Sequence, residues 1–422
     1  MMMYAYRVLC WLIVPIAMIR IFFRSLKESS YRDQISERFG LVPKDTKKDS
    51  IWVHAVSVGE VLASQQLIER LHENDRNRQF IITCATPTGK RTALKNLPSQ
   101  VQVFYAPFDI LLFVRSFLSR TKPRALLVME TEIWPNMFNE CSQRSIPIYM
   151  INARISERSL KRYQRFSSLT KSTLNCVTSI CAQSEGDLSR FKQITNTEIH
   201  NFGNLKYERD PNAEQIVLGG EIISLLEGQR RVIVAASTHE GEEIELLKEF
   251  KKIESENILL IIIPRHPNRF QSVASLIKDQ GFKLCRRSDN KTIPKHGRVM
   301  LGDSLGEMYA YYFCANAVIM GGSFVRHGGQ NPLEALTMGK YVIMGPHTYN
   351  FSEIVEDGIR ENVIFRARNV STAIEMAYEM AVDTSRQQYI SNMTNEFIRK
   401  KRGALDKTIR RLESDSKLSP KP

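Results

Sequence analysis

The sequence of 422 residues lacks the patterns that hold a metal ion or a disulfide framework. It contains no His-Glu-x-x-His and no Asp-x-Asp, so a metal-held pyrophosphate is not indicated. Its seven cysteines are odd in number and scattered, with no Cys-x-x-Cys pair. They predict reduced, mostly buried thiols in a cytosolic compartment. We therefore expect neither a metal nor a cofactor.

Two further absences narrow the choice of ligand. The glycine-rich stretches do not follow the Gly-x-x-x-x-Gly-Lys-Ser/Thr order of a Walker A loop. No recognised reader module or basic stripe interleaved with aromatic residues is present, so nucleic acid is not an expected partner. Lys plus Arg at 59 against Asp plus Glu at 45 nevertheless gives a net charge of +14. This charge favours an anionic partner, such as an acidic membrane surface or a phosphorylated substrate.

Long hydrophobic runs are missing too, apart from one near the N-terminus. Val8 to Ile19 is a run of twelve uncharged residues, short of the ~20 that a spanning helix needs, and it continues past Arg20 to Phe23. No small-residue cleavage site precedes the basic residues that follow, which disfavours a signal peptide. We expect residues 1–40 to form a single anchor or an interfacial helix, with the rest of the chain on the cytoplasmic side. A buried core helix is the alternative.

Short apolar strands alternate with helical stretches from Ile51 onward. This alternation is the βαβ pattern of a parallel sheet covered by helices on both faces. It pauses over about 201–227, where the sequence is polar and rich in turn residues, and then resumes. We predict an α/β fold with two Rossmann-like domains, residues 41–207 and 213–390, facing a cleft. Residues 391–422 are expected to form a helix and a frayed basic tail.

A candidate general base lies at the end of the first strand. The strand breaks at Ser57-Val58-Gly59-Glu60, which places Glu60 where ligands bind in open α/β sheets. The alternative is a capping box, in which Ser57 accepts from the amide of Glu60 and the Glu60 side chain reaches back to the amide of Ser57. A side chain folded back in this way is not expected to reach a substrate hydroxyl as well. The same spacing recurs at three later junctions: Ser237/Glu240, Ser304/Glu307 and Asn331/Glu334.

Three more charged residues of the first half are candidates. Glu130 and Glu132 follow an apolar strand, and one of them could cap the next helix while the other faces the cleft. Lys206 lies just before the linker and could deliver a cation, although a solvated lysine is the alternative. A basic helical face, either solvated or in contact with an anionic lipid, is formed at i, i+3, i+4 and i+7 by Arg158, Lys161, Arg162 and Arg165.

The second half carries two motifs suited to a phosphate. Residues 321–334 hold four glycines ahead of a predicted helix, which lets the backbone approach a ligand closely; a plain turn is the alternative. Arg265 and His266 end a very apolar strand at the same edge of the sheet. An arginine there can bind phosphate in a bidentate manner, and a salt bridge is the alternative.

In their order, these motifs resemble those of the Kdo transferases, membrane-associated enzymes that move 3-deoxy-D-manno-octulosonic acid (Kdo) from CMP-Kdo onto a lipid A precursor. The resemblance implies a GT-B glycosyltransferase fold without a metal, at the cytoplasmic face of the bacterial inner membrane, acting in lipopolysaccharide biosynthesis. The matching stretches, from about Ile51 to Phe351, are HAVSVGE, METEIWPN, NARISERS, GNLK, ASTHEGEE, IPRHPNRF, GDSLGEM, GGSFVRHGGQNPLEA and MGPHTYNF.

The resemblance also implies a role for each matching residue. Glu60 would deprotonate the acceptor hydroxyl for an inverting displacement in which CMP leaves. Glu130 and Lys206 match positions that stabilise the transition state, although the adjacent Glu132 leaves the choice of carboxylate open. Beyond what the resemblance implies, we expect Arg154 and the basic helical face to suit the phosphates of the lipid. The CMP site would comprise Arg265, His266, Gly306, Glu307, Met308, Asn331, Pro332, Leu333 and Glu334.

Two competing hypotheses come from other classes of protein. One is a nucleotide-sugar epimerase of similar two-domain architecture, which would be soluble and is disfavoured by the apolar segment near the N-terminus. The other is a non-catalytic membrane-surface protein that binds anionic lipid through its basic face.

Overall fold

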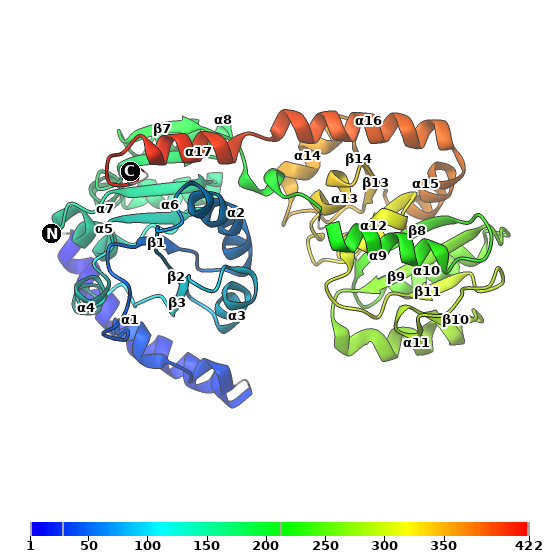
Figure 1. The fold of residues 1–422 in the computed structure, drawn as a ribbon, viewed down its shortest axis with the longest axis horizontal. Coiled ribbons are helices and arrows are strands. Elements are labelled where there is room, and N and C mark those ends of the chain that lie inside the picture. Colours follow the sequence, from blue (N-terminus) through cyan, green and yellow to red (C-terminus); the bar gives the residue numbers. More distant parts are fainter. Residues whose placement is uncertain (1, 28, 212, 420–422) are drawn as a thin grey trace. The chain divides into compact units, whose positions relative to one another are not determined.

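The computed structural model describes residues 2–27, 29–211 and 213–419, which form two compact units. Unit 1 consists of the chain up to Glu208 together with the segment from Arg402 onward, and unit 2 runs from Arg209 to Lys401. Figure 1 shows the elements of both units along the chain. The C-terminal segment is thus not a separate piece, since its two helices belong to different units.

Unit 1 is built on a seven-stranded parallel sheet in the order β3-β2-β1-β4-β5-β6-β7. Its strands are β1 (Ile51–His54), β2 (Phe80–Cys84), β3 (Gln102–Tyr105), β4 (Ala125–Met129), β5 (Ile148–Ala153), β6 (Ser179–Ala182) and β7 (Glu198–Asn201). Its helices are α1 (Met2–Lys27), α2 (Val58–Asn74), α3 (Pro87–Asn96), α4 (Leu111–Thr121), α5 (Pro135–Gln143), α6 (Glu157–Arg165), α7 (Ser167–Leu174), α8 (Glu185–Lys192) and α17 (Ala404–Glu413). Short 3₁₀ turns are η1 (Ser29–Tyr31), η2 (Ile35–Phe39) and η3 (Leu205–Glu208).

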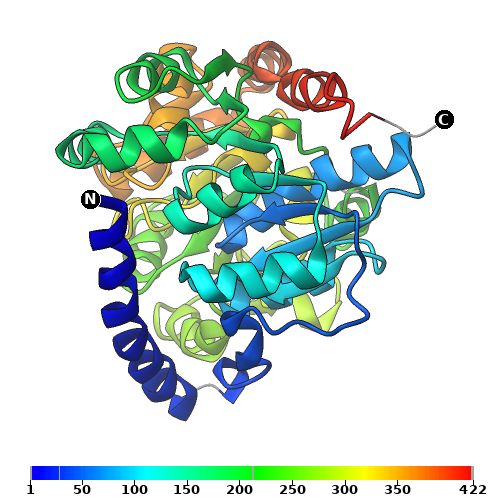
Figure 2. The ribbon, with the colours of Figure 1, turned by 90° about the vertical axis from the view of Figure 1, so that its left-hand side faces the viewer.

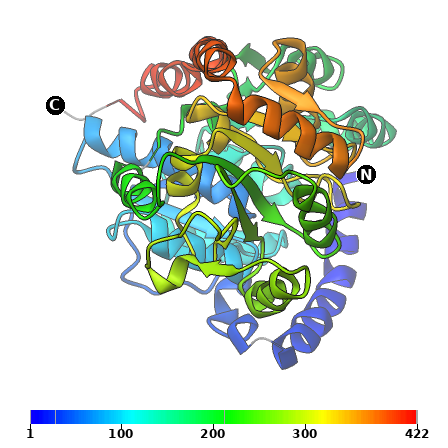
Figure 3. The ribbon, with the colours of Figure 1, turned by 90° about the vertical axis from the view of Figure 1, so that its right-hand side faces the viewer.

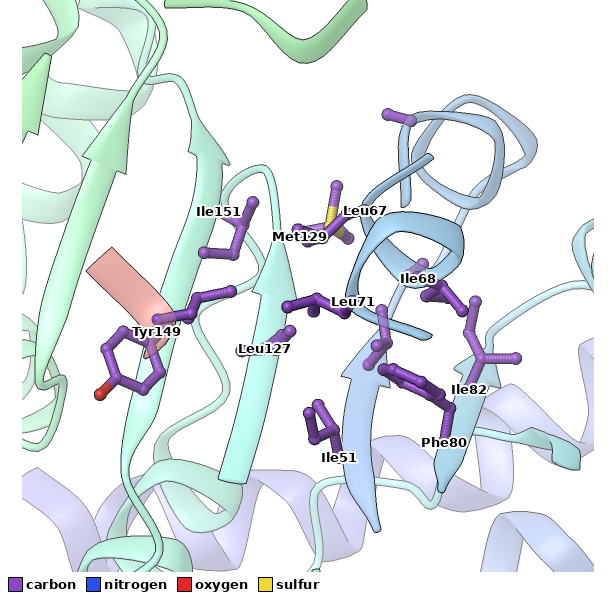
Figure 4. Close-up of a cluster of buried hydrophobic side chains, with 14 of the residues drawn as sticks. Ile51, Leu67, Ile68, Leu71, Phe80, Ile82, Leu127, Met129, Tyr149 and Ile151 are labelled. Atoms are coloured by element: carbon purple, nitrogen blue, oxygen red, sulfur yellow. The ribbon is translucent and has the colours of Figure 1, made fainter. Parts of the chain in front are cut away.

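The strands of unit 1 are apolar on both faces because helices cover both sides of the sheet. Successive side chains of a strand point to opposite faces, so Ile51 and Trp52 enter different core clusters. On one face Leu67 and Leu71 of α2 pack against the strands, as Figure 4 shows. This packing fixes the start of α2, and therefore Glu60, at the carboxyl end of β1.

Unit 2 repeats the arrangement with the strand order β10-β11-β9-β8-β12-β13-β14, again all parallel. Its strands are β8 (Arg231–Thr238), β9 (Ile258–Pro264), β10 (Leu284–Arg286), β11 (Val299–Leu301), β12 (Ala317–Met320), β13 (Tyr341–Met344) and β14 (Ile364–Arg366). Its helices are α9 (Ala213–Ser224), α10 (Glu242–Lys251), α11 (Phe270–Asp279), α12 (Met308–Cys314), α13 (Leu333–Thr337), α14 (Ser352–Arg360), α15 (Val370–Val382) and α16 (Thr384–Lys401). Short 3₁₀ turns are η4 (Pro267–Arg269) and η5 (Arg287–Asp289). Figure 3 shows helices on both sides of these strands.

The C-terminal segment contains parts of two helices, α16 and α17, where one helix was expected within 391–422. It breaks between α16 and α17 at Gly403, whose φ of 104° lies in the left-handed region that favours glycine. The expectation of a frayed tail is wrong as far as Ser419, because the tail packs on unit 1. Tyr149 Oη donates to Asp415 Oδ2 at 2.5 Å, and the buried Arg78 donates to the carbonyl of Leu418 at 3.0 Å. Residues 420–422 lie outside the described residues.

Helix α1 runs along the outside of unit 1, as seen in Figure 1 and Figure 2. By length and composition, Met2–Leu26 could cross a membrane. Only 6% of its most apolar window is buried, so the alternative of a buried core helix is wrong. Its large apolar side chains are instead exposed, among them Leu12, Ile16 and Phe23.

Candidate active site

Glu60 adopts the folded-back conformation of a capping box. Ser57 is the N-cap of α2, and its Oγ accepts from the Glu60 amide at 3.3 Å and donates to Glu60 Oε1 at 2.8 Å. The amide of Val56, rather than the expected amide of Ser57, donates to Glu60 Oε2 at 2.8 Å. The residue is buried, with 6% of its surface exposed. The sequence left the base and the cap as alternatives, and this conformation is the cap.

The carboxylate of Glu60 can still accept a proton while it makes the capping contacts. Each carboxylate oxygen has two lone pairs, and the cap uses one on each. Burial raises the pKa of Glu60 to about 7, with a further rise from Glu132 and Glu130 and an opposing effect of the bonds from Ser57 and Val56. A carboxylate with such a pKa is matched to proton transfer near neutral pH. The capped carboxylate thus keeps lone pairs that can accept a proton, and the role of Glu60 as the base stays a prediction.

The three later junctions with the same spacing do not form this box. Glu240 is exposed, and α10 begins only at Glu242. Glu307 accepts from Ser304 Oγ at 2.7 Å but also from Arg287 at 3.1 Å, and it precedes the first residue of α12. Glu334 lies 3.6 Å from Arg209. Among the four junctions, reciprocal capping thus occurs at Glu60 alone.

Glu130 lies in a small cluster of charges at the end of β4. Lys206 Nζ is 2.9 Å from its Oε1, and Arg154 Nε is 3.6 Å from its Oε2. The backbone of Glu130 has a φ of 53°, a conformation that costs a non-glycine residue of order 1–3 kcal/mol. The structure therefore brings together Glu130 and Lys206, and it places Arg154, expected at the phosphates of the lipid, beside the same carboxylate.

Glu132 has a different partner and does not cap the next helix. Its Oε2 accepts from Trp134 Nε1 at 2.9 Å, and burial raises its pKa against the effect of that bond. The amides at the start of α5 donate instead to Asp109, at 3.0 Å from Asn136 and 2.8 Å from Met137. The expectation that Glu130 or Glu132 caps α5 is wrong, because Asp109 already accepts from both of these amides.

A hydrogen-bonded chain holds the loop that carries Lys206. The amide of Lys206 donates to Asn204 Oδ1 at 3.0 Å, and Asn204 Nδ2 donates to Gln183 Oε1 at 2.9 Å. Gln183 in turn donates to the carbonyl of Asn152 at 2.7 Å, and Asn152 Oδ1 accepts from the amide of Leu205 at 3.0 Å. Sequence reasoning missed these positioning residues. Asn152 and Asn204 lay inside matched motifs, whereas nothing in the sequence pointed to Gln183.

The glycine-rich loop of unit 2 is held in place by a buried glutamate. Glu242 accepts from the amides of Gly322 and His239, each at 2.8 Å, and from that of Phe324 at 3.1 Å. Gly322 has a φ of 68°, and a Cβ at Gly321 would collide with the carbonyl of Ser237. Gly322 is thus required by its backbone conformation and Gly321 by close packing, and the phosphate-binding role of this loop stays a prediction.

Arg265 and His266 emerge together at the end of β9, and both are exposed. The salt bridge at this edge is made by Arg269, which binds Glu243 at 2.5 and 3.1 Å. Arg265 has no salt bridge within the described part of the chain, although its charge acts on Glu334 to lower the pKa that burial raises. Arg265 is therefore available for an anion, as its position at the strand end suggested.

The remaining predicted nucleotide residues lie at the starts of α12 and α13. Gly306, with a φ of 80°, and Glu307 precede α12, which begins at Met308. Asn331 Oδ1 accepts from the amide of Leu333 at 3.1 Å, and Pro332 is the N-cap of α13 rather than its first residue. The shared role of these two groups in nucleotide binding stays a prediction.

Sequence reasoning also missed two histidines that gather near His266. The ring of His239 stacks on that of His327 at 4.3 Å and meets that of His266 edge-on at 5.8 Å. Gln330 Nε2 lies 3.0 Å from His239 Nε2. Burial and the neighbouring cationic groups lower the pKa of His239, which favours its neutral form. In the described residues, no group of three or more His, Cys, Asp or Glu side chains could hold a metal ion.

Several known proteins are similar to this chain in sequence, in fold or in both. Residues 33–209 match the family described as 3-deoxy-D-manno-octulosonic-acid transferase (kdotransferase). A 3-deoxy-D-manno-octulosonic acid transferase of Haemophilus influenzae is 32% identical over 402 residues, covering 94% of each chain. The chain belongs to this family. A second member, from Bordetella pertussis, is 33% identical over 374 residues and 86% of each chain.

Membership of the Kdo transferase family confirms the predicted family and the predicted enzyme class, a glycosyltransferase. The UDP-GlcNAc 2-epimerase of Neisseria meningitidis has a similar fold, with a TM-score of 0.58 over 87% of this chain and 100% of that chain. At 14% identity this likeness shows the fold alone. It confirms the GT-B class of two Rossmann-like units and gives no support to the epimerase hypothesis.

Proposed function

We propose that this Kdo transferase moves Kdo from CMP-Kdo to a glucosamine hydroxyl of a lipid A precursor, with inversion at the anomeric carbon. The observation that carries the proposal is the buried carboxylate of Glu60, whose pKa of about 7 suits a general base. Glu60 takes the proton of the acceptor hydroxyl. The hydroxyl oxygen then bonds to the anomeric carbon while the bond to the phosphate breaks and CMP leaves with its electron pair.

Glu130 and Lys206 are proposed to stabilise the transition state. Positive charge grows on the sugar ring as CMP leaves, and a fixed carboxylate nearby lowers the energy of that charge. Lys206 and Arg154 hold the carboxylate of Glu130 from two sides. The chain from Asn152 through Gln183 to Asn204 keeps Lys206 in place, so the charges need little reorganisation during the reaction.

Unit 2 is proposed to bind the nucleotide. Arg265 is exposed and suits the phosphate of CMP, with the backbone at Gly306, Glu307 and Met308 as further donors. Glu334 can accept from ribose hydroxyls. The other proposed contacts of the nucleotide are His266, Asn331, Pro332 and Leu333.

The enzyme is proposed to work at the cytoplasmic side of the inner membrane, with α1 lying in the membrane surface. Three contacts tie the first half of α1 to unit 1: Tyr6 with Asp109 at 2.7 Å, Arg7 with Asn136 at 3.1 Å, and Trp11 with Phe113 at 5.7 Å between ring centroids. The helix beyond Trp11, which ends at Lys27, is about 24 Å long at ~1.5 Å per residue. This is less than the ~30 Å of the hydrocarbon core, which supports an interfacial helix.

Mass spectrometry of the lipid product tests the proposed function. The full chain is incubated with CMP-Kdo and a lipid A precursor, and we expect a lipid heavier by one or more Kdo residues together with released CMP. Release of CMP without transfer of the sugar would contradict the proposal. The number of added sugars is read from the same spectrum.

A further inference from the structure

A cavity of about 420 Å³ opens in unit 1 between α1, α6, α7 and the segment before α5. It is formed by parts of the chain that lie far apart in the sequence. Its apolar lining includes Met2, Ala5, Leu9, Ile133, Phe166 and Leu169.

Three hydroxyl groups in the wall of this cavity, those of Tyr6, Thr170 and Thr173, are already bonded within the protein. Tyr6 Oη donates to Asp109 at 2.7 Å. Thr170 Oγ1 donates to the carbonyl of Tyr163 at 2.9 Å, and Thr173 Oγ1 donates to that of Leu169 at 2.8 Å. The donors of Tyr6, Thr170 and Thr173 are therefore not offered to a ligand. A cavity of this kind suits an alkyl chain better than a polar molecule or a water cluster.

The rim of the cavity is basic. Arg162 lines it, and three further exposed cations lie on α6: Arg158, Lys161 and Arg165. None of the four has a salt bridge with an acidic side chain in the described part of the chain, so their charge is available to an external anion. An alkyl chain next to an anionic group is the chemistry of a phosphorylated lipid.

The wall of the cavity continues into the candidate active site. Ile133 and Pro135 line the cavity, and the same short segment carries Glu130 and Glu132 at the end of β4. Trp134, between the two lining residues, donates to Glu132. A lipid whose chain enters the cavity would therefore hold its headgroup near the charged cluster around Glu130.

We propose that this cavity binds one acyl chain of the phosphorylated glycolipid acceptor, while the basic side chains of α6 contact its phosphate. The inference rests on the proposed function and adds a binding site for the acceptor. At ~30 Å³ for a group the size of a water molecule, the cavity has room for about a dozen methylene groups. Burying only two methylene groups strengthens binding about ten-fold, so the site can contribute strongly to affinity.

Photolabelling tests the site directly. The full chain is mixed with a lipid A precursor whose acyl chains carry a diazirine, irradiated, and mapped by mass spectrometry. We expect labels on Ile133, Phe166 and Leu169, which excess unlabelled precursor prevents and excess phosphatidylglycerol does not. Labels confined to the outer face of α1, at residues such as Leu12 and Ile16, would overturn the proposal. Equal competition by phosphatidylglycerol would also overturn it, since the cavity would then hold bulk membrane lipid.

A pair of substitutions on α1 separates filling of the cavity from damage to the helix. Ala5→Trp places a large ring in the cavity, whereas Val8→Trp adds the same ring at a residue that is 61% exposed and does not line it. We expect Ala5→Trp to lower labelling and to raise KM for the acylated acceptor about ten-fold or more, with kcat kept. Val8→Trp should match the wild type in both measurements. Equal behaviour of the two variants would contradict the inference.

The proposed function and the acyl site can fail separately. A deacylated acceptor sugar lacks the chain, so its transfer should be the same in the wild type and in Ala5→Trp. Specific labelling of the cavity without any Kdo transfer would contradict the proposed function alone. Kdo transfer with no labelling of the cavity would contradict the acyl site alone.

Discussion

Two buried glutamates occupy equivalent places in the two units, yet they are held in different ways. Glu60 follows β1 and Glu242 follows β8, each near the start of the next helix, with 6% and 2% of their surfaces exposed. Glu60 accepts from one amide and one hydroxyl. Glu242 accepts from three amides, two of which belong to the glycine-rich loop.

This difference in hydrogen bonding makes Glu60 a candidate base and Glu242 a structural cross-link. Burial raises the pKa of both side chains, but three amides oppose the rise at Glu242 and occupy three of its lone pairs. At Glu60 a hydroxyl and one amide oppose it, while Glu132 and Glu130 add to it. Burial alone therefore does not identify a base. A neighbouring carboxylate, Glu243, adds to the rise at Glu242 as well, so the number of amide donors is what distinguishes the two carboxylates.

The largest expected effect that sharpens this comparison is the loss of the base. Glu60→Gln removes the proton acceptor and should lower kcat about 10²–10⁴-fold, while the affinity for CMP-Kdo stays that of the wild type. Single-turnover transfer to the lipid A precursor and binding of CMP-Kdo measure the two quantities. A variant with the kcat of the wild type would exclude Glu60 as the base.

Removal of the cation beside Glu130 should have the next largest effect. Lys206→Met takes away the amine that lies 2.9 Å from Glu130 and should lower kcat about 10²–10³-fold, because a charge fixed at the reacting centre is lost. Lys192→Met makes the same charge change on an exposed residue of α8 and serves as the control. If both variants lost activity equally, the effect would come from net charge rather than from the cluster.

Replacing Glu242, the cross-link of unit 2, should lower the stability of the protein more than it lowers kcat. In Glu242→Gln an amide N–H of the side chain faces backbone N–H groups, which should lower the free energy of unfolding by about 1–3 kcal/mol and raise KM for CMP-Kdo. The matched control is Glu240→Gln, an exposed position two residues away, with an expected change within about 0.5 kcal/mol. Thermal unfolding and donor kinetics measure both. A fall in kcat as large as that of Glu60→Gln would break the distinction between the two glutamates.

The smallest expected effect is on how the stability of the protein depends on pH. The pKa of Glu60 is raised from 4.5 to about 7 in the folded protein, so its contribution is favourable below pH 4.5 and is lost as the pH rises through about 7. Glu60→Gln should therefore be more stable relative to the wild type at about pH 8 than at about pH 4. The shift sets an upper limit of about 3 kcal/mol, and we expect about 1 kcal/mol because a capping bond is weakened as well. Melting temperatures of both proteins at the two pH values measure the difference, and a difference of opposite sign would contradict the raised pKa.

The fold was accessible from the sequence because its signals are local. Apolar strands bounded by Ser/Asn-x-x-Glu turns predicted two parallel sheets, and the pause near 201–227 marked the change from one unit to the other. The return of the chain to unit 1 was not predicted. It depends on the left-handed backbone of Gly403 and on distant partners such as Arg78 with Leu418, which no local pattern reveals.

The candidate site could be predicted only in part, because local patterns do not reveal contacts between distant segments. Motifs placed Glu60, Glu130 and Lys206 at strand ends, and the structure brings Glu130 and Lys206 into contact. The same spacing predicted caps at Glu240 and Glu334, where the helix begins elsewhere or the side chain meets an arginine. Gln183 and Asp109 act through side-chain bonds to distant segments, so neither could be found from spacing.

The pH dependence of kcat/KM for Kdo transfer tests the central claim, that Glu60 is the general base, most directly. In the wild type we expect the rate to rise with pH through a limb near pH 7, which follows the pKa of about 7 for Glu60 in the free enzyme. Glu242→Gln should keep this limb, and the residual activity of Glu60→Gln should lack it. A limb near pH 7 that persists in Glu60→Gln would contradict the account.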